Sequence, residues 1–486
     1  MMAQYIGTRA GAGAESGTFA PSVKPPMRLM TRAAVALLAV PAILVAAVLA
    51  LGGWQLVRVA AGPRLPASAA TDDAQYFRET VLANERSGSE DQRKAFDALS
   101  REIVARRPSL DDEALSLEVA RGLTVFDNAH THVTDSHLRR LPLRFHWFAD
   151  GLYVVKARPQ YEALLGARVV SIEDLDPEEL LRQLRAFIPG VEGWRRYRSE
   201  YFLSAPATLA ALGVSTDTNV VAFEFRKRAG APVTLAVPVD AKVLPSDAFR
   251  EFRHLLPLDI SFETEGWLRL ADGIDPKPLY LRDMPSPYAL TWLESERAVY
   301  VRVSGSVNTR QIDLPTFLGQ ALHEVTEHHA KHAIVDMRFN WGGGYELTRR
   351  FSADLANALP ADGKVFIITG PNTFSAGLIM AARLVHFAGR KAVVVGEPLG
   401  DRLQFWAEGF SVVLPHSQVE MYLSTAAHDF KEGCRLFDQD CFILDKFMGV
   451  AVGELAPGVA ARNTFDDFMA GRDGAMLRIR EIIEGR

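Results

Sequence analysis

Ser375 is the residue whose position in this sequence best suits a nucleophile. It stands in Ile368–Ala381, "ITGPNTFSAGLIMA", where a strand pattern ends, a turn follows and an apolar helix pattern begins. A hydroxyl at the start of a helix lies at the positive end of the helix dipole, beside backbone N–H groups without partners. Serine is also a preferred N-cap residue, and this stretch alone favours the cap over the nucleophile.

Acyl transfer by a serine needs a base and a pocket for the oxyanion. The run Gly342–Gly344 follows the strand pattern "IVDMRFN", and one of its N–H groups could form that pocket with the N–H of Ala376. A helix-entry turn would use the same glycines. The stretch "FDNAHTHVTDSH" offers His130, His132 and His137 as bases, although a lone histidine is more often structural.

The elements that must position these residues form the clearest pattern in the chain. From Tyr288 on, short β-branched runs alternate with helical patterns, which predicts parallel βαβ units. The glycine run and the Ser375 stretch both follow strands, and sites of such sheets lie at the carboxyl ends of the strands. We therefore expect the two stretches to meet in space.

The rest of the chain divides by composition and pattern. The segment 72–144 reads as helical and carries the histidine element, while 145–244 reads as a mixed domain with a β-hairpin turning at Gly230. The full expected division is a disordered cytoplasmic tail 1–32, a transmembrane anchor 33–57, a linker 58–71, a helical region 72–144, a mixed α and β domain 145–244, a connecting segment 245–287 and an α/β core 288–486.

Residues 33–57 carry no charge, and this length exceeds the roughly 20 apolar residues that cross a bilayer. The basic residues before the segment favour a cytoplasmic N-terminus and a periplasmic or otherwise extracytoplasmic body. A cleaved signal peptide is the rival, with "ASA" at 67–69 as its cut site, but its apolar region usually spans only about 7–15 residues. We predict an uncleaved single-pass anchor that holds the protein on the membrane.

Charge and cysteine content narrow the function further. The net charge of −5 leaves no basic field to gather nucleic acid. Cys434 and Cys441 are the two cysteines, and their proximity in an oxidising compartment predicts a disulfide, with two free thiols as the alternative. The helix pattern "HEVTEHH" fails the spacing of a zinc-protease helix because Glu327 stands where the second histidine belongs. No metal or organic cofactor is expected.

Four stretches in order resemble the tail-specific (C-terminal processing) protease and tricorn-core superfamily. They are "DNAHTHV", "IVDMRFNWGGG", "ITGPNTFSAG" and "VVVGEPLGD", and the closing "FMAGRDGAML" is similar as well. The resemblance covers the chain from about Asp111 to its end. It implies an α/β fold with a crotonase-like ββα-superhelix core at 288–486 and a PDZ-like α+β domain at 145–244.

The resemblance also implies site residues. Ser375 matches the nucleophile, His130 matches the base of the tricorn-like branch, and the N–H groups of Gly343 and Ala376 match the oxyanion pocket.

This sequence departs from the family at two places. Asp401 and Arg402 occupy the region of the lysine base in the C-terminal processing branch, and an arginine cannot accept a proton, which leaves a Ser/His pair. A histidine base usually needs an orienting carboxylate, and "FWAEGFSVVLP" places Glu408 for that role. Glu397 and Glu432 are its competitors.

These observations predict a membrane-anchored, exported serine peptidase acting on polypeptide substrates. The rival is a binding protein on the same scaffold, because the superfamily includes an interphotoreceptor retinoid-binding protein, and the ligand would be a lipid, a retinoid-type molecule or a peptide. The sequence leaves the oligomeric state open.

Overall fold

The computed structural model describes residues 48–49, 52–67, 72–135, 138–228, 230–240, 266–283 and 286–486. The chain divides into two compact units, Met1–Ala50 and Leu51–Arg486, and nearly all of the described residues belong to the second. Its helices and strands form three sheets with helices packed on them. The expected mixed α/β class is confirmed.

The largest run of apolar strands forms a six-stranded sheet with the order β15-β12-β11-β10-β9-β8. Strands β9 to β12 and β15 pair in parallel, and β8 joins β9 as an antiparallel hairpin. The strands are β8 (Tyr288–Leu293), β9 (Ala298–Val303), β10 (His332–Asp336), β11 (Lys364–Thr369), β12 (Ala392–Gly396) and β15 (Val459–Ala460).

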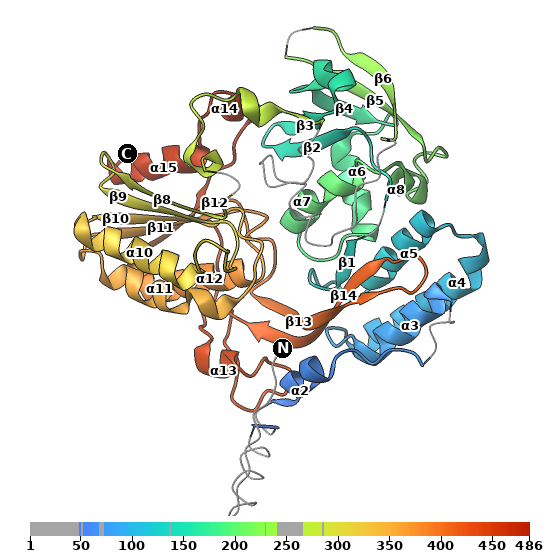
Figure 1. The fold of residues 1–486 in the computed structure, drawn as a ribbon, viewed down its shortest axis with the longest axis horizontal. Helices are drawn as coiled ribbons and strands as arrows, with labels where there is room; N and C mark the ends of the chain where they lie inside the picture. The colour runs from blue at the N-terminus through green and yellow to red at the C-terminus, as the bar shows by residue number, and fades with distance from the viewer. Residues whose placement is uncertain are drawn as a thin grey trace, which may run out of the picture. The chain divides into compact units, whose positions relative to one another are not determined.

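Both faces of this sheet are buried, which explains why its strands are apolar throughout. Because side chains alternate along a strand, Val299 and Val335 face one hydrophobic cluster while Tyr300 and Ile334 face another. Helices α10, α11 and α12 lie on one face and α15 on the other (Figure 1). These helices span Leu314–Glu327 (α10), Arg349–Asp354 (α11), Ala376–Ala388 (α12) and Gly474–Ile483 (α15).

A second, antiparallel sheet has the order β2-β3-β4-β5-β6, with β7 paired to β3. It is drawn in green and teal in Figure 1, together with α6, α7 and α8. The elements are β2 (Leu143–Phe148), β3 (Gly151–Ala157), β4 (Arg168–Ile172), β5 (Val220–Arg226), β6 (Val233–Pro238), β7 (Leu268–Arg269), α6 (Pro177–Gln183), α7 (Glu192–Phe202) and α8 (Pro206–Ala211).

The third sheet joins distant parts of the chain in the order β1-β14-β13. Its β1 comes from the segment expected to be helical, while β13 and β14 follow the core strands. Helices α2 to α5 and α13 lie near it (Figure 1). These elements are α2 (Trp54–Ala61), α3 (Asp73–Asn84), α4 (Glu90–Arg106), α5 (Asp112–Thr124), β1 (His132–Asp135), β13 (Gln404–Val413), β14 (Glu420–Asp429) and α13 (Asp445–Met448). The remaining helix, α14 (Phe465–Met469), packs against the second sheet through Phe465.

The predicted membrane anchor at 33–57 lies for the most part outside the described residues. At its described end, Gly52 with a φ of +88° precedes the short helix α2. There the buried Gln55 amide donates to the carbonyls of Gln439 and Cys441 at 2.7 and 3.0 Å. No helix in the described ranges has both the length and the apolar character to cross a bilayer. This finding contradicts the prediction of a single-pass membrane protein.

Candidate active site

Ser375 lies at the junction between β11 and α12. Its φ of 52° and ψ of −125° place it outside the helical region, in a conformation that non-glycine residues rarely adopt. Although it occupies the N-cap position of α12, its side chain makes no capping hydrogen bond. The Ser375 hydroxyl therefore does not cap α12, and the N-cap interpretation does not account for this serine.

The glycine turn after β10 passes directly against Ser375. A Cβ added to Gly342 would lie 2.7 Å from the Cβ of Ser375 and 3.1 Å from its Oγ. Gly342 and Gly343 also have φ values of 114° and 126°, which L side chains rarely adopt. Both positions require glycine because of this close approach and backbone conformation.

Two backbone N–H groups near Ser375 remain available. The turn is fixed because Gly342 N donates to Asn340 Oδ1 at 3.1 Å and Gly344 N donates to Ser306 O at 2.8 Å. Between them, Gly343 N donates no hydrogen bond within the described part of the chain, and neither does Ala376 N at the start of α12. These are the groups predicted for the oxyanion pocket.

Ser375 and His130 line one cavity of about 310 Å³, which we call the serine cavity. The third sheet brings His130 there, because His130 lies just before strand β1 of that sheet. Gly343, Trp341, Glu408 and Tyr422 are among the other lining residues.

The His130 ring is fixed from three sides. Its Nδ1 lies 3.2 Å from Asp401 Oδ2. The ring also stacks on Phe374, with the two ring centroids 4.2 Å apart, and on Phe405, with the centroids 5.0 Å apart. Its Nε2 is buried and has no hydrogen-bond partner among the described residues. When Nδ1 donates to the carboxylate, Nε2 is the acceptor of the neutral ring.

The turn that carries His130 is held by a buried polar network. Asn128 Nδ2 donates to Thr131 Oγ1 at 2.9 Å and to Ser424 Oγ at 3.0 Å. Thr131 Oγ1 in turn donates to Glu85 Oε2 at 2.9 Å. Burial raises the pKa of Glu85, with hydrogen bonds from its serine and threonine neighbours opposing the shift.

Arg402 fastens the same turn to the loop after β12. Its guanidinium lies 2.6 Å from Asp127 Oδ2 and donates to the Asp127 carbonyl at 2.7 Å. Its backbone N–H donates to Asp401 Oδ1 at 2.8 Å. Arg402 thus ties the turn that carries His130 to the loop after β12.

Glu408, the predicted orienting carboxylate, has a different partner. It lines the serine cavity, but its Oε1 lies 3.5 Å from Nε2 of the buried His428. His428 Nδ1 lies 2.5 Å from Asp445 Oδ2. Burial disfavours the charged ring, but hydrogen bonds to Asp445 and Glu408 outweigh it and raise the pKa of His428 to about 9. The structure pairs His130 with Asp401 and Glu408 with His428.

Sequence reasoning did not assign Asp401 to the site, although it noted the residue beside Arg402. The signal was weak because 271 positions separate Asp401 from His130, and only the fold brings them together.

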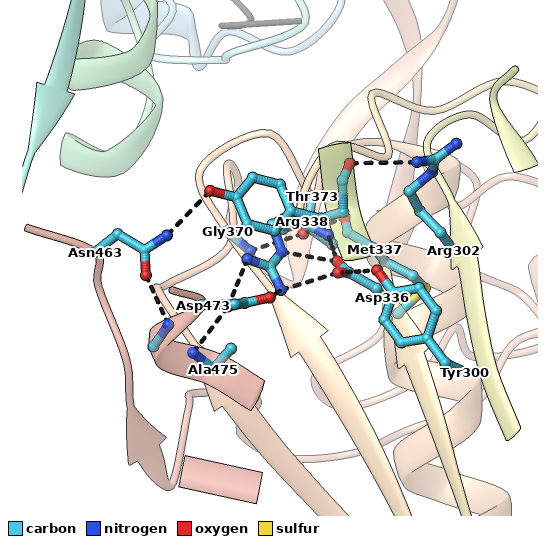
Figure 2. Close-up of polar contacts among 12 residues, drawn as sticks. Tyr300, Arg302, Asp336, Met337, Arg338, Gly370, Thr373, Asn463, Asp473 and Ala475 are labelled. Carbon is cyan, nitrogen blue, oxygen red and sulfur yellow. Dashed lines mark hydrogen bonds and ion pairs between the residues drawn. The ribbon is translucent and has the colours of Figure 1, made fainter. Parts of the chain in front are cut away.

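The strand ends that carry the site are tied by a second buried network (Figure 2). Arg338 Nε donates to Asp336 Oδ1 at 2.9 Å, and its two terminal nitrogens pair with Asp473 at 3.0 and 2.9 Å. Thr373 Oγ1 donates to the carbonyl of Met337 at 2.8 Å. This network joins the end of β10 to the turn before Ser375 and to the start of α15.

The remaining candidates lie elsewhere. Glu397 pairs with Arg462 at 3.0 Å, Glu432 lies in an exposed turn, and the structure joins Cys434 to Cys441 by a disulfide. Across the described ranges, no group of three His, Cys, Asp or Glu side chains is arranged to hold a metal ion. Of the predicted site residues, Ser375, His130, Gly343 and Glu408 line one cavity.

Comparison with known proteins identifies the fold. No family model and no curated protein matches the sequence. Mature CPAF complexed with lactacystin is 10% identical, with a TM-score of 0.52 over 85% of this chain and 97% of that chain. A serine-to-alanine mutant of CPAF is 11% identical, with a TM-score of 0.55 over 85% of this chain and 96% of that chain.

A photosystem II D1 C-terminal processing protease also matches, at 12% identity over 80% of this chain and 93% of that chain. Its TM-score of 0.33 is too low to carry an argument. The chain therefore has the fold of CPAF.

Proposed function

We propose that the protein is a serine-type peptidase in which Ser375 is the nucleophile and His130 the base. The observation that carries the proposal is the serine cavity itself. It brings together a serine that does not cap its helix, a histidine held by a carboxylate, and a glycine N–H without a partner. The shared fold with a protein crystallised with lactacystin and as a serine-to-alanine mutant agrees with it.

In the proposed mechanism, His130 Nε2 accepts the proton of the Ser375 hydroxyl as Oγ attacks the carbonyl carbon of the scissile peptide bond. The N–H groups of Gly343 and Ala376 donate to the resulting oxyanion. His130 then gives its proton to the leaving amine, and the C–N bond breaks to leave an acyl-enzyme. Water attacks this ester with His130 again as base, which releases the acid and restores Ser375.

Asp401 takes the orienting role in this proposal instead of Glu408. A carboxylate that accepts from Nδ1 fixes the tautomer in which Nε2 is free to accept a proton, and it stabilises the imidazolium that forms. The distance of 3.2 Å and the burial of Asp401 support this assignment.

We further propose that 288–486 is the crotonase-like core and that 145–244 is a PDZ-like domain that receives an extended polypeptide. The second sheet supports this proposal because it is antiparallel and β6 ends its strand order, so β6 can pair with an added strand. The helical region 72–144 then supplies the base to the core.

The test compares the full-length chain with Ser375→Ala and His130→Ala. We expect cleavage of an unstructured protein to fall by about a thousandfold or more in both variants, because each removes a member of a unit. A fluorophosphonate probe, which acylates activated serines irrespective of substrate preference, is expected to label the wild type at Ser375 and to leave both variants unlabelled. Circular dichroism spectra verify that the variants remain folded.

Cleavage or labelling that survives in Ser375→Ala would remove this serine from the proposal. Absence of both cleavage and labelling in the wild type would contradict the peptidase proposal as a whole. The labelling arm separates an inactive site from an active site that lacks its preferred substrate.

A further inference from the structure

The serine cavity is acidic where the third sheet forms its wall. Two carboxylates, those of Glu408 in β13 and Glu420 in β14, are among its lining residues. The described residues that line the cavity include no lysine and no arginine. Three other titratable groups line it, those of His130, His132 and Tyr422. Burial lowers the pKa of His132 well below its usual value and raises the pKa of Tyr422 to about 12, so both groups are neutral at physiological pH.

The two carboxylates differ in their partners. Glu408 Oε1 lies 3.5 Å from Nε2 of His428, and the other ring nitrogen of His428 contacts Asp445. Because one imidazolium stands between two carboxylates, this group of three side chains keeps a net negative charge. Glu420 is half-buried and has no ion pair and no side-chain hydrogen bond within the described part of the chain. Glu420 is therefore the carboxylate that is free to pair with a ligand.

The register of the third sheet places Glu420 on the face that borders the cavity. Tyr422 in the central strand β14 pairs with His132 in β1 and with Ser411 in β13. All three residues of this row line the serine cavity, and so does Glu420, two positions before Tyr422. Because side chains alternate along a strand, Glu420 lies on the same face of the sheet as the row. A three-stranded wall thus holds the free carboxylate in place.

The other walls of the cavity are largely apolar. Trp341 from the glycine turn, Phe374 from the turn before α12 and Ala407 from β13 line it. A wholly apolar side chain would fit these walls, but it would take water from the carboxylates without supplying a donor, which is unfavourable. A lysine or arginine side chain has an apolar stem and a charged end, so it suits both kinds of wall. The volume of about 310 Å³ lies at the lower end of the range of ligand pockets, roughly 300–1,000 Å³, and admits one such side chain with the adjoining backbone.

We propose that the serine cavity receives a lysine or arginine side chain of the substrate, so that the protein cleaves polypeptides on the carboxyl side of basic residues. This inference rests on the proposed function, because it names the substrate class of the Ser375 site. The carbonyl that Ser375 attacks is held beside Gly343, which also lines the cavity. The side chain nearest to that carbonyl belongs to the same substrate residue. Glu420 pairs with its ammonium or guanidinium group and determines specificity without taking part in bond cleavage.

The first test measures kcat/KM of the full-length chain on peptides that differ only in the residue before the scissile bond. That residue is lysine, acetyl-lysine, norleucine or glutamate. Norleucine has the aliphatic chain of lysine without the ammonium group, and acetyl-lysine keeps the nitrogen without its charge. We expect the lysine peptide to be cleaved at least about tenfold more efficiently than each of the others, because only its ammonium group pairs with a carboxylate in a site partly open to solvent. Mass spectrometry of the products locates the cleaved bond.

Glu420→Gln removes the charge of this side chain and keeps its shape. We expect it to lower the ratio of kcat/KM between the lysine and norleucine peptides about tenfold, a change of preference that a general loss of structure would not produce. Glu162→Gln is the matched control, because it makes the same chemical change on an exposed residue outside the cavity and is expected to keep the ratio of the wild type. Labelling of Ser375 by the fluorophosphonate probe verifies that both variants are folded with a reactive serine.

Diphenyl phosphonate analogues of lysine and norleucine give a second measurement, which does not depend on cleavage of any peptide. Each reacts covalently with an activated serine and places its side chain where the substrate residue would lie. We expect the lysine analogue to modify Ser375 of the wild type at least about tenfold faster than the norleucine analogue. This comparison also decides the proposal if Glu420→Gln does not fold.

The outcomes separate this inference from the proposed function. If the fluorophosphonate probe labels Ser375 but the lysine and norleucine analogues react at equal rates, the basic preference is wrong and the peptidase proposal stands. A lysine preference that survives in Glu420→Gln would overturn the role of Glu420. A wild type that no probe labels at Ser375 would contradict the proposed function and this inference together.

Discussion

At the scale of single residues, two carboxylates near the serine cavity have different partners. Asp401 contacts the Nδ1 of His130, while Glu408 contacts the Nε2 of His428. The sequence predicted Glu408 for the role that the geometry favours for Asp401. The distinction matters because only a carboxylate on His130 can set the tautomer of the proposed base.

The variants Asp401→Asn and Glu408→Gln separate these assignments. An asparagine amide can donate to Nδ1 and thereby move the ring proton to Nε2, where it blocks acceptance from Ser375. We expect Asp401→Asn to lower kcat about a hundredfold to ten-thousandfold and Glu408→Gln to lower it less than about tenfold. Steady-state kinetics on one peptide measure both. A larger loss in Glu408→Gln would return the orienting role to that residue.

At the scale of elements, the sequence predicted what local pattern determines. The strands of the core are continuous apolar runs bounded by turn residues, and they form the expected parallel sheet because both faces are buried. The hairpin around Gly230 was predicted for the same local reason.

The sequence did not reveal what depends on distant contacts or on backbone strain. Nothing near Asp401 in the chain indicates His130 as its partner, and β1 became a strand because β14, far along the chain, pairs with it. Serine favours an N-cap conformation, and the positive φ of Ser375 follows from tertiary packing against the glycine turn.

Alanine substitutions at two helix glycines test how tightly the elements around Ser375 are packed. A Cβ on Gly377 in α12 would lie 2.3 Å from the carbonyl of Asn340, whereas a Cβ on Gly319 in α10 would meet nothing within 4 Å. We expect Gly377→Ala to destabilise the protein by about 1–3 kcal/mol through overpacking. Gly319→Ala is expected to stabilise it by about 0.5–1 kcal/mol through helix propensity.

Thermal unfolding of the two variants beside the wild type gives the sign of each change. Gly319→Ala is the matched control, because it introduces the same methyl group into another helix on the same face of the sheet. Equal effects of the two substitutions would show that the turn at Asn340 moves freely and does not fix the start of α12.

At the scale of the whole molecule, side-chain contacts join segments that lie far apart in the sequence. The closing segment of the chain returns to the core through Asp473, which pairs with Arg338 across 135 positions. Likewise, the side-chain amide of Gln55 in α2, near the start of the described chain, donates a hydrogen bond to the carbonyl of Cys441 in the disulfide loop. Asp473 of the closing segment thus completes the buried network shown in Figure 2.

Arg338→Gln tests how much this closure contributes to stability. The substitution removes the cation from between Asp336 and Asp473, which are both buried and would then repel each other without compensation. Breaking a buried pair in this way costs about 3–5 kcal/mol, so we expect a clear fall in the urea midpoint, measured by tryptophan fluorescence. Arg350→Gln is the control, since the Arg350 side chain is 93% exposed and its pair with Asp354 contributes little. Arg338→Gln could instead unfold at the same urea concentration as Arg350→Gln. In that case the attraction among the three buried charges only offsets the cost of removing them from water, and the apolar packing of α15 on the sheet holds the closing segment in place.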